Sequence, residues 1–184
     1  VRTNGQTRSA RLFSTRLKSN RFRPVSTENL ADRTHINAMN TALRILARRD
    51  HSVAELVRKL ARRGYAEDAI QRVVAECGRL GYLDDGRAAD QVIDRMKRRG
   101  MGARRIRHEL QQRGLDGREV EAQLQARVPP LEERSTARRV ALKKWDALAG
   151  EPDPQKKRLR LQRFLRYRGF PDSLVFEILE EMVS

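Results

Sequence analysis

The sequence repeats one ten-residue phrase three times, as LVRKLARRGY at 56–65, IRHELQQRGL at 106–115 and LQRFLRYRGF at 161–170. In each phrase an apolar residue is followed four positions later by a leucine and three positions after that by an arginine. A glycine and another apolar residue then complete the phrase. The first two copies start 50 residues apart and the last two 55 apart. A nearly constant spacing of this size is typical of tandem-repeat architectures.

Each phrase is predicted to be an α-helix that ends at its glycine. The apolar residues recur at the spacing of one helix face, and glycine readily adopts the left-handed conformation that closes many helices. A capping box, Ser52 to Glu55, precedes the first phrase. Asp153–Pro154 gives the third phrase an N-cap and a proline at the first helical position, and Pro171 is predicted to hold that first position in the last helix.

Helices before and after each phrase complete a three-helix unit. After the first phrase, a buried face is predicted by four residues at i, i+3, i+4 and i+7: Ile70, Val73, Val74 and Cys77. Asp84 or Asp85 is predicted to cap the next unit, in which Asp94 is expected to pair with Arg98. We therefore predict an all-α, elongated array of three tandem units, each touching only its neighbour. The expected units are 38–83, 84–128 and 129–184.

The chain of 184 residues is strongly basic, since 40 Lys and Arg against 24 Asp and Glu give a formal net charge of +16. This excess favours an anionic partner, most simply nucleic acid or a nucleoprotein. No apolar run approaches the ~18 residues of a membrane span, so we expect no membrane partner. The single cysteine, Cys77, excludes a disulfide framework and favours a reducing compartment such as the cytoplasm.

Residues 1–37 carry eight basic residues and two acids, and the first 27 contain no acid. Because they show neither helical nor strand periodicity, we expect a disordered basic tail over 1–37. Two alternatives stay open. One is a transit peptide, which is typically Arg- and Ser-rich and acid-poor. The other is an upstream stretch ahead of the natural start, since the sequence opens with Val.

The joint between the first two units carries further motifs, in the stretch RLGYLDDGRAADQVIDRMKRRGMGARRIRHELQQRGLD at 79–116. The motifs of this stretch and its surroundings are GYLDD at 81–85, Ala89, GMG at 100–102, RIxxEL at 105–110, HSxxEL at 51–56 and RxRGF at 166–170. In this combination the chain resembles the RecX regulatory proteins, which modulate the RecA recombinase. The resemblance covers residues 38–184. One departure is Ala88, where the family usually has Phe or Tyr, which thins the packing at this joint.

This resemblance implies a curved array of three helix-turn-helix-like repeats with no catalytic activity. It implies that the partner is the RecA filament on single-stranded DNA, along whose helical groove the protein lies. Inhibition of ATP hydrolysis, filament extension and strand exchange would follow, and would limit recombination and the SOS response. We expect the protein to be a monomer and to carry no cofactor. We also expect weak, salt-sensitive contacts between the protein and single-stranded DNA, with double-stranded DNA as a further possible ligand.

Basic residues recur at equivalent positions of the units, and these are the predicted contacts to the filament or DNA. They end the first helices of two units, line the second helices, and form an i, i+4, i+7 stripe in the third unit. The candidates are Arg48, Arg49, Arg62, Arg63, Arg98, Arg99, Arg104, Arg105, Arg107, Arg113, Lys156, Arg160 and Arg163. A solvated charged face explains any one of them more simply, but it does not explain the overall excess.

The main alternative function is a general DNA-binding protein whose helix-turn-helix-like units grip phosphates. No unit stands out as a reader of bases, because basic residues exceed acidic ones in all three. Scarce aromatic residues also argue against a dedicated platform for stacking single-strand bases. We expect neither a catalytic nor a metal site. The aspartates Asp84, Asp85, Asp90 and Asp94 are explained as caps and surface pairs, and His35, His51 and His108 share no ligand spacing.

Overall fold

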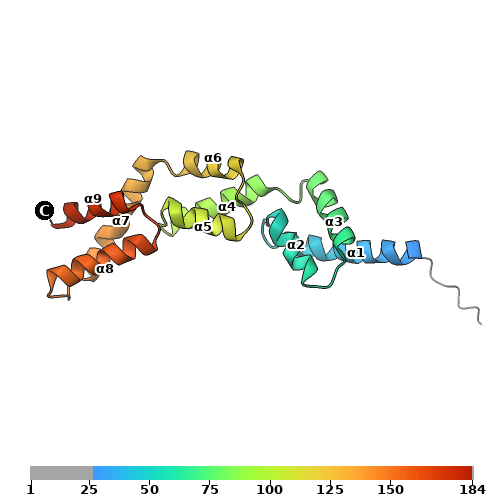
Figure 1. The fold of residues 1–184 in the computed structure, drawn as a ribbon, viewed down its shortest axis with the longest axis horizontal. Helices are drawn as coiled ribbons and strands as arrows, with labels where there is room; N and C mark the ends of the chain where they lie inside the picture. Colours follow the sequence, from blue (N-terminus) through green and yellow to red (C-terminus); the bar gives the residue numbers. More distant parts are fainter. Residues whose placement is uncertain (1–26, 184) are drawn as a thin grey trace, which may run out of the picture.

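The computed structural model describes residues 27–183. These residues form nine α-helices and no strand, arranged as an elongated row in which groups of three helices follow one another (Figure 1). The helices are α1 (Thr27–Leu46), α2 (Val53–Ala61), α3 (Glu67–Arg79), α4 (Asp85–Arg98), α5 (Ala103–Gln112), α6 (Arg118–Arg127), α7 (Pro130–Ala147), α8 (Pro154–Tyr167) and α9 (Asp172–Val183). The all-α array of three-helix units predicted from the repeat is confirmed.

Each group of three helices encloses its own apolar cluster. The clusters lie among α1–α3, α4–α6 and α7–α9. The two repeated apolar positions of each phrase form the centre of each cluster, with exposures of 1% or less: Leu56, Leu60, Ile106, Leu110, Leu161 and Leu165. Cys77 is fully buried in the first cluster, where burial raises the pKa of its thiol, whereas Val74 is only partly buried. Each copy of the sequence repeat therefore forms the centre of its own small hydrophobic core.

The predicted helix caps at three positions are present. Ser52 accepts a hydrogen bond from the Glu55 amide at 3.0 Å, and the Glu55 carboxylate accepts one from the Ser52 amide at 3.3 Å, which completes the capping box. Asp84, rather than Asp85, caps α4. Asp153 caps α8 by accepting from the amides of the second and third residues of the helix. The caps of α2 and α8 fix where the second helix of a unit begins.

Two local predictions are wrong. Asp94 pairs with Arg127 at 2.6 Å rather than with Arg98, because Asp90 and Asp94 lie on the face of α4 that packs on α6, where Arg127 bridges both. Pro171 is not the first residue of α9. Its carbonyl already accepts the hydrogen bond from the Val175 amide, so Pro171 occupies the capping position and the helix begins at Asp172.

The predicted tail also differs at its end, because α1 begins at Thr27 and residues 27–37 are helical rather than disordered. The core contacts of α1 come from Ala38, Ala42 and Ile45, and the helix continues outward beyond them. Ile36 is 57% exposed, and among the side chains that the structure describes the apolar cluster of α1 begins only at Ala38, so burial gives no periodic signal here in the sequence. The part of the predicted tail before Thr27 lies outside the described residues.

Candidate filament and nucleic-acid interface

One type of joint connects successive units. The Arg–Gly turn after the second helix of the later unit packs on the N-terminus of the second helix of the earlier unit. At the first joint the Ser52 hydroxyl donates a hydrogen bond to the Arg113 carbonyl at 2.5 Å. At the second joint the Gly102 amide donates one to the Arg168 carbonyl at 2.8 Å. Because these residues are equivalent in the repeat, the sequence repeat also repeats the contacts between units.

The partly buried carboxylate of Glu55 organises the first joint. Arg49 donates two hydrogen bonds to Glu55, at 2.8 and 3.0 Å, and a nitrogen of Arg113 from the next unit lies 3.4 Å from the same carboxylate. Burial alone would raise the pKa of Glu55. The hydrogen bonds from Arg49 and the Ser52 amide, with the charges of both arginines, outweigh burial and lower that pKa to about 2. Two predicted contact residues, Arg49 and Arg113, are therefore engaged in holding the joint together.

Four other predicted contacts are also paired with carboxylates. The pairs are Arg104–Asp172 at 3.4 Å, Arg107–Glu121 at 2.6 Å, Lys156–Asp153 at 3.6 Å and Arg160–Glu151 at 2.7 Å. Seven predicted contacts have no carboxylate partner within residues 27–183: Arg48, Arg62, Arg63, Arg98, Arg99, Arg105 and Arg163. Within residues 27–183 the structure thus separates predicted contacts that are paired with a carboxylate from those that are not.

The α1–α2 cleft, of about 680 Å³, lies in unit one and contains three of these seven cations, Arg48, Arg62 and Arg63. Its basic lining consists of Arg44, Arg48, Arg49, His51, Lys59, Arg62 and Arg63. His51 is 2% exposed, and its Nε2 lies 2.7 Å from the Lys59 ammonium, which donates to it. Burial, followed by the charges of Arg49 and Lys59, lowers the pKa of His51 and keeps the ring neutral. No carboxylate lines this cleft.

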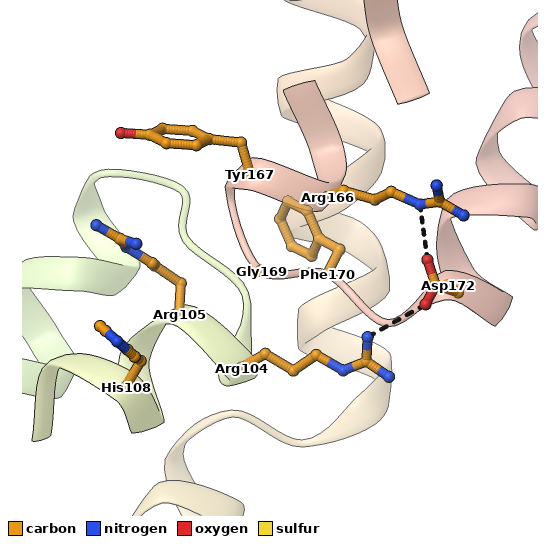
Figure 2. Close-up of a pocket in the computed structure, with 8 residues that line it drawn as sticks. All are labelled: Arg104, Arg105, His108, Arg166, Tyr167, Gly169, Phe170 and Asp172. Carbon is orange, nitrogen blue, oxygen red and sulfur yellow. Dashed lines mark hydrogen bonds and ion pairs between the residues drawn. The ribbon is translucent and has the colours of Figure 1, made fainter. Parts of the chain in front are cut away.

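The α5–α8 cleft, also about 680 Å³, lies at the second joint (Figure 2). Arg104 of α5 and Arg166 of α8 share one carboxylate, that of Asp172, at 3.4 and 2.8 Å. Tyr167 projects from the end of α8 and is 70% exposed, while the guanidinium of Arg105 lies 5.5 Å from the centre of its ring. Tyr167 was not predicted from the sequence. The aromatic content was judged over the whole chain, and a low average does not reveal a single aromatic residue beside arginines.

The α4–α7–α8 cleft, of about 500 Å³, is the third basic cleft and also spans the second joint. It contains two predicted residues, Arg98 and Arg99, and four that the sequence did not single out: Arg139, Lys143, Lys144 and Arg168. The signal for Arg168 was present, since it is the repeat equivalent of Arg113. Arg139 and Lys143 lie four residues apart on α7, a spacing that places them on one helix face.

Metal-ligand clusters and membrane-spanning helices are two further features that the described residues could hold. No group of three or more His, Cys, Asp or Glu side chains in residues 27–183 is arranged to hold a metal ion. Among these helices, none is both long and apolar enough to cross a membrane. The fold and its clefts define the class: an elongated, all-helical repeat protein whose successive units carry basic residues without carboxylate partners among the described residues.

Comparison with known proteins identifies the particular family. Sequence models of RecX match the first three-helix domain at residues 38–77, the second at 84–124 and the third at 132–179. A "Regulatory protein RecX" of Vibrio vulnificus (strain CMCP6) is 36% identical over 135 residues, covering 73% of this chain and 86% of its own. That of Legionella pneumophila (strain Corby) is 32% identical over 149 residues, covering 80% and 95%. The chain belongs to the RecX family of regulatory proteins.

The fold agrees with solved structures of the same family. A crystal structure of RecX from Lactobacillus salivarius superimposes with a TM-score of 0.70 at 17% identity, covering 82% of this chain and 97% of that one. A second structure, described as regulatory protein RecX, gives a TM-score of 0.70 at 21% identity, covering 84% and 75%. At these identities the likeness concerns the fold, which is shared over most of the array.

Proposed function

We propose that this protein binds the RecA filament on single-stranded DNA, along its helical groove, and restrains it. In this proposal it inhibits ATP hydrolysis by RecA, filament extension and strand exchange, and so limits recombination and the SOS response in the bacterial cytoplasm. Membership of the RecX family supports RecA as the partner. The observation that carries the proposal is an elongated array with unpaired cations on successive units, since a periodic array suits a periodic, anionic partner.

The three units, 38–83, 84–128 and 129–184, would act together in this binding. Unpaired predicted contacts lie in all three: Arg48, Arg62 and Arg63 in the first, Arg98, Arg99 and Arg105 in the second, and Arg163 in the third. Modest contacts on one connected chain add as avidity, because after the first contact the others form within one molecule. The proposed contact set is therefore these seven residues, and a monomer suffices for it.

The second candidate function is general DNA binding through phosphates, without recognition of RecA. Two clefts favour it, because the α1–α2 and α4–α7–α8 clefts are lined by cations and by no carboxylate. Phosphate contacts give affinity that falls steeply with salt and does not depend on sequence. Such contacts would contribute under either function, so they do not decide between the two.

The decisive experiment measures ATP hydrolysis by RecA filaments formed beforehand on single-stranded DNA. The protein is added well below the RecA concentration, and a parallel reaction contains excess competitor DNA. Strong inhibition at substoichiometric protein that survives the competitor supports a filament-directed regulator. Inhibition that requires stoichiometric protein, or disappears with competitor DNA, supports general DNA binding and contradicts the proposal.

A further inference from the structure

The α4–α7–α8 cleft concentrates positive charge without any local compensation. Six of its lining residues are basic and none is acidic: Arg98, Arg99, Arg139, Lys143, Lys144 and Arg168. Within residues 27–183 none of the six has a carboxylate partner. Residues 1–26 contain no acid, so that segment of the chain offers no carboxylate to the cleft either. Because no carboxylate within residues 27–183 pairs with this cleft, we look for its balancing negative charge in another molecule.

The cations are held close together at an electrostatic cost. Burial, followed by the charge of Arg139, lowers the pKa of Arg168. Its guanidinium lies 4.5 Å from the centre of the Phe164 ring and donates to the Arg99 and Gly100 carbonyls at 2.5 and 3.0 Å. Its Nε is buried and has no hydrogen-bond partner among the described residues. Arg168 is therefore locked in place beside other cations, and an anion in the cleft would relieve the repulsion between them.

The chemistry of the lining favours phosphate over a protein surface. The cleft offers no large exposed apolar anchor. Val140 is 8% exposed, the Phe164 ring is covered by Arg168 and, at 5.6 Å, by Lys144, and the remaining apolar lining residue is the small Ala147. Protein–protein interfaces centre on such anchors and are depleted in lysine. Phosphate groups are typically bound by arginine guanidinium groups, which can donate two hydrogen bonds at once, together with lysine ammonium groups. We propose that this cleft binds the phosphate groups of a nucleic-acid strand.

Such a ligand would bridge two units. Arg98 and Arg99 end α4 of the second unit, whereas Arg139, Lys143 and Arg168 belong to α7 and the end of α8 in the third. In Figure 1 the third unit follows the second directly at this joint. A phosphate held from both sides would stiffen the angle between the units. This inference deepens the DNA contact within the proposed function and rests on that function. The oligonucleotide affinities below are measured without RecA, and binding to preformed RecA filaments is measured separately, so failure of the phosphate site and failure of the proposed function can be told apart.

The test compares two doubly substituted full-length chains with the unaltered protein. Arg139→Gln with Lys143→Gln removes two exposed cleft cations for which the structure shows no hydrogen bond or ion pair, so the fold should survive. Arg33→Gln with Arg118→Gln is the matched control, because it removes the same charge from exposed positions on α1 and α6, outside the cleft. Circular dichroism verifies that all three chains are folded. Affinity for a single-stranded and a double-stranded oligonucleotide is measured across a range of salt concentrations.

We expect the cleft variant to bind single-stranded DNA about tenfold more weakly at low salt, while the control changes much less. The slope of log affinity against log salt should become shallower by about 0.7 for each phosphate that the variant no longer neutralises. Pyrophosphate should raise the melting temperature of the unaltered chain and the control but not of the cleft variant. Weaker binding of both oligonucleotides supports a site for the phosphates of the nucleic-acid backbone, which accepts single-stranded and double-stranded DNA alike. An effect on pyrophosphate alone indicates a site for free phosphate and contradicts the proposal.

Two other outcomes would overturn the proposal. If the cleft and control variants lose equal affinity and equal salt slope, the cleft is merely part of a diffuse basic surface. If the cleft variant keeps its affinity for both oligonucleotides but no longer binds preformed RecA filaments, the cleft receives an acidic protein surface instead. In that second case the proposed regulation of RecA would stand, and only the phosphate site would fall.

Discussion

Gly114 packs so closely against Ala54 of the preceding unit that a β-carbon on the glycine would overlap the alanine methyl group. Gly169 meets Arg105 in the same way at the second joint. Both glycines have left-handed backbones, with φ of +74° and +85°. Gly64 has the equivalent backbone, with φ of +81°, but nothing lies within 4 Å of its missing β-carbon. The three equivalent glycines therefore separate the cost of the backbone conformation from the cost of packing between units.

Substitution of alanine at two of these glycines should have unequal effects. Gly64→Ala places an L side chain in a left-handed conformation with open space around it, and should lower the free energy of unfolding by about 1 kcal/mol. Gly114→Ala adds a clash across the joint and should cost about 2–4 kcal/mol in all. Urea unfolding monitored by circular dichroism gives both values. Equal losses would show that the joint relaxes without cost.

The acid dependence of stability should depend strongly on Glu55. Its pKa in the folded chain is about 2 against an ordinary 4.5, so the unfolded chain binds the proton more readily. The stabilisation is fully present above about pH 5 and is lost as the pH falls toward 2. Glu55→Gln should remove roughly 1–3 kcal/mol at pH 7 and flatten the dependence between pH 5 and 2. Unfolding curves at a series of pH values test this, and an unchanged slope would contradict the assignment.

A second effect of pH on stability should come from His51, in a pH range closer to neutrality. Burial and the neighbouring cations lower its pKa below 6.5, so the folded chain resists protonation that the unfolded chain accepts. Stability contributed by the neutral ring is present above pH 6.5 and is lost as the pH falls below it. His51→Gln should show a smaller loss of melting temperature between pH 6.5 and 5 than the unaltered chain. A parallel decline in both would show that His51 does not titrate in this range.

Paired and unpaired arginines should respond differently to removal of their charge. Arg62→Gln removes a cation of the α1–α2 cleft that has no carboxylate partner among the described residues, and should weaken binding to single-stranded DNA about three- to tenfold at low salt. Arg107→Gln breaks two hydrogen bonds to Glu121, at 2.6 and 2.8 Å, and should chiefly lower stability. Fluorescence anisotropy with a labelled oligonucleotide and thermal unfolding separate the two effects. The distinction fails if both variants lose affinity equally.

The units and their cores could be predicted from the sequence because local rules determine them. Leu56 and Leu60 lie one turn apart, Gly64 ends their helix, and Ser52 begins it, each through contacts within about ten residues. The start of α1 at Thr27 could not be predicted in the same way. Among the side chains that the structure describes there, Ile36 is exposed and the apolar cluster begins only at Ala38, so burial leaves no periodic pattern to recognise.

The choice among the thirteen basic candidates could not be made from the sequence. Whether an arginine is paired depends on which helix the fold places opposite it. Arg107 meets Glu121 from α6 and Arg104 meets Asp172 from the next unit, whereas Arg105, between them in sequence, meets no carboxylate among the described residues. The α4–α7–α8 cleft was missed for the same reason, since its cations come from three helices that only the fold brings together.

The start of α8 differs from the start of α5, where the second joint forms. The amide of Gly102, just before α5, is free to receive the Arg168 carbonyl of the following unit. At the start of α8 the amides of Gln155 and Lys156 are already occupied by the Asp153 carboxylate. The second helix of the third unit therefore starts differently from that of the second unit, where the Gly102 amide joins two units. The repeat conserves the apolar core and the Arg–Gly turn of each unit more closely than it conserves the helix start.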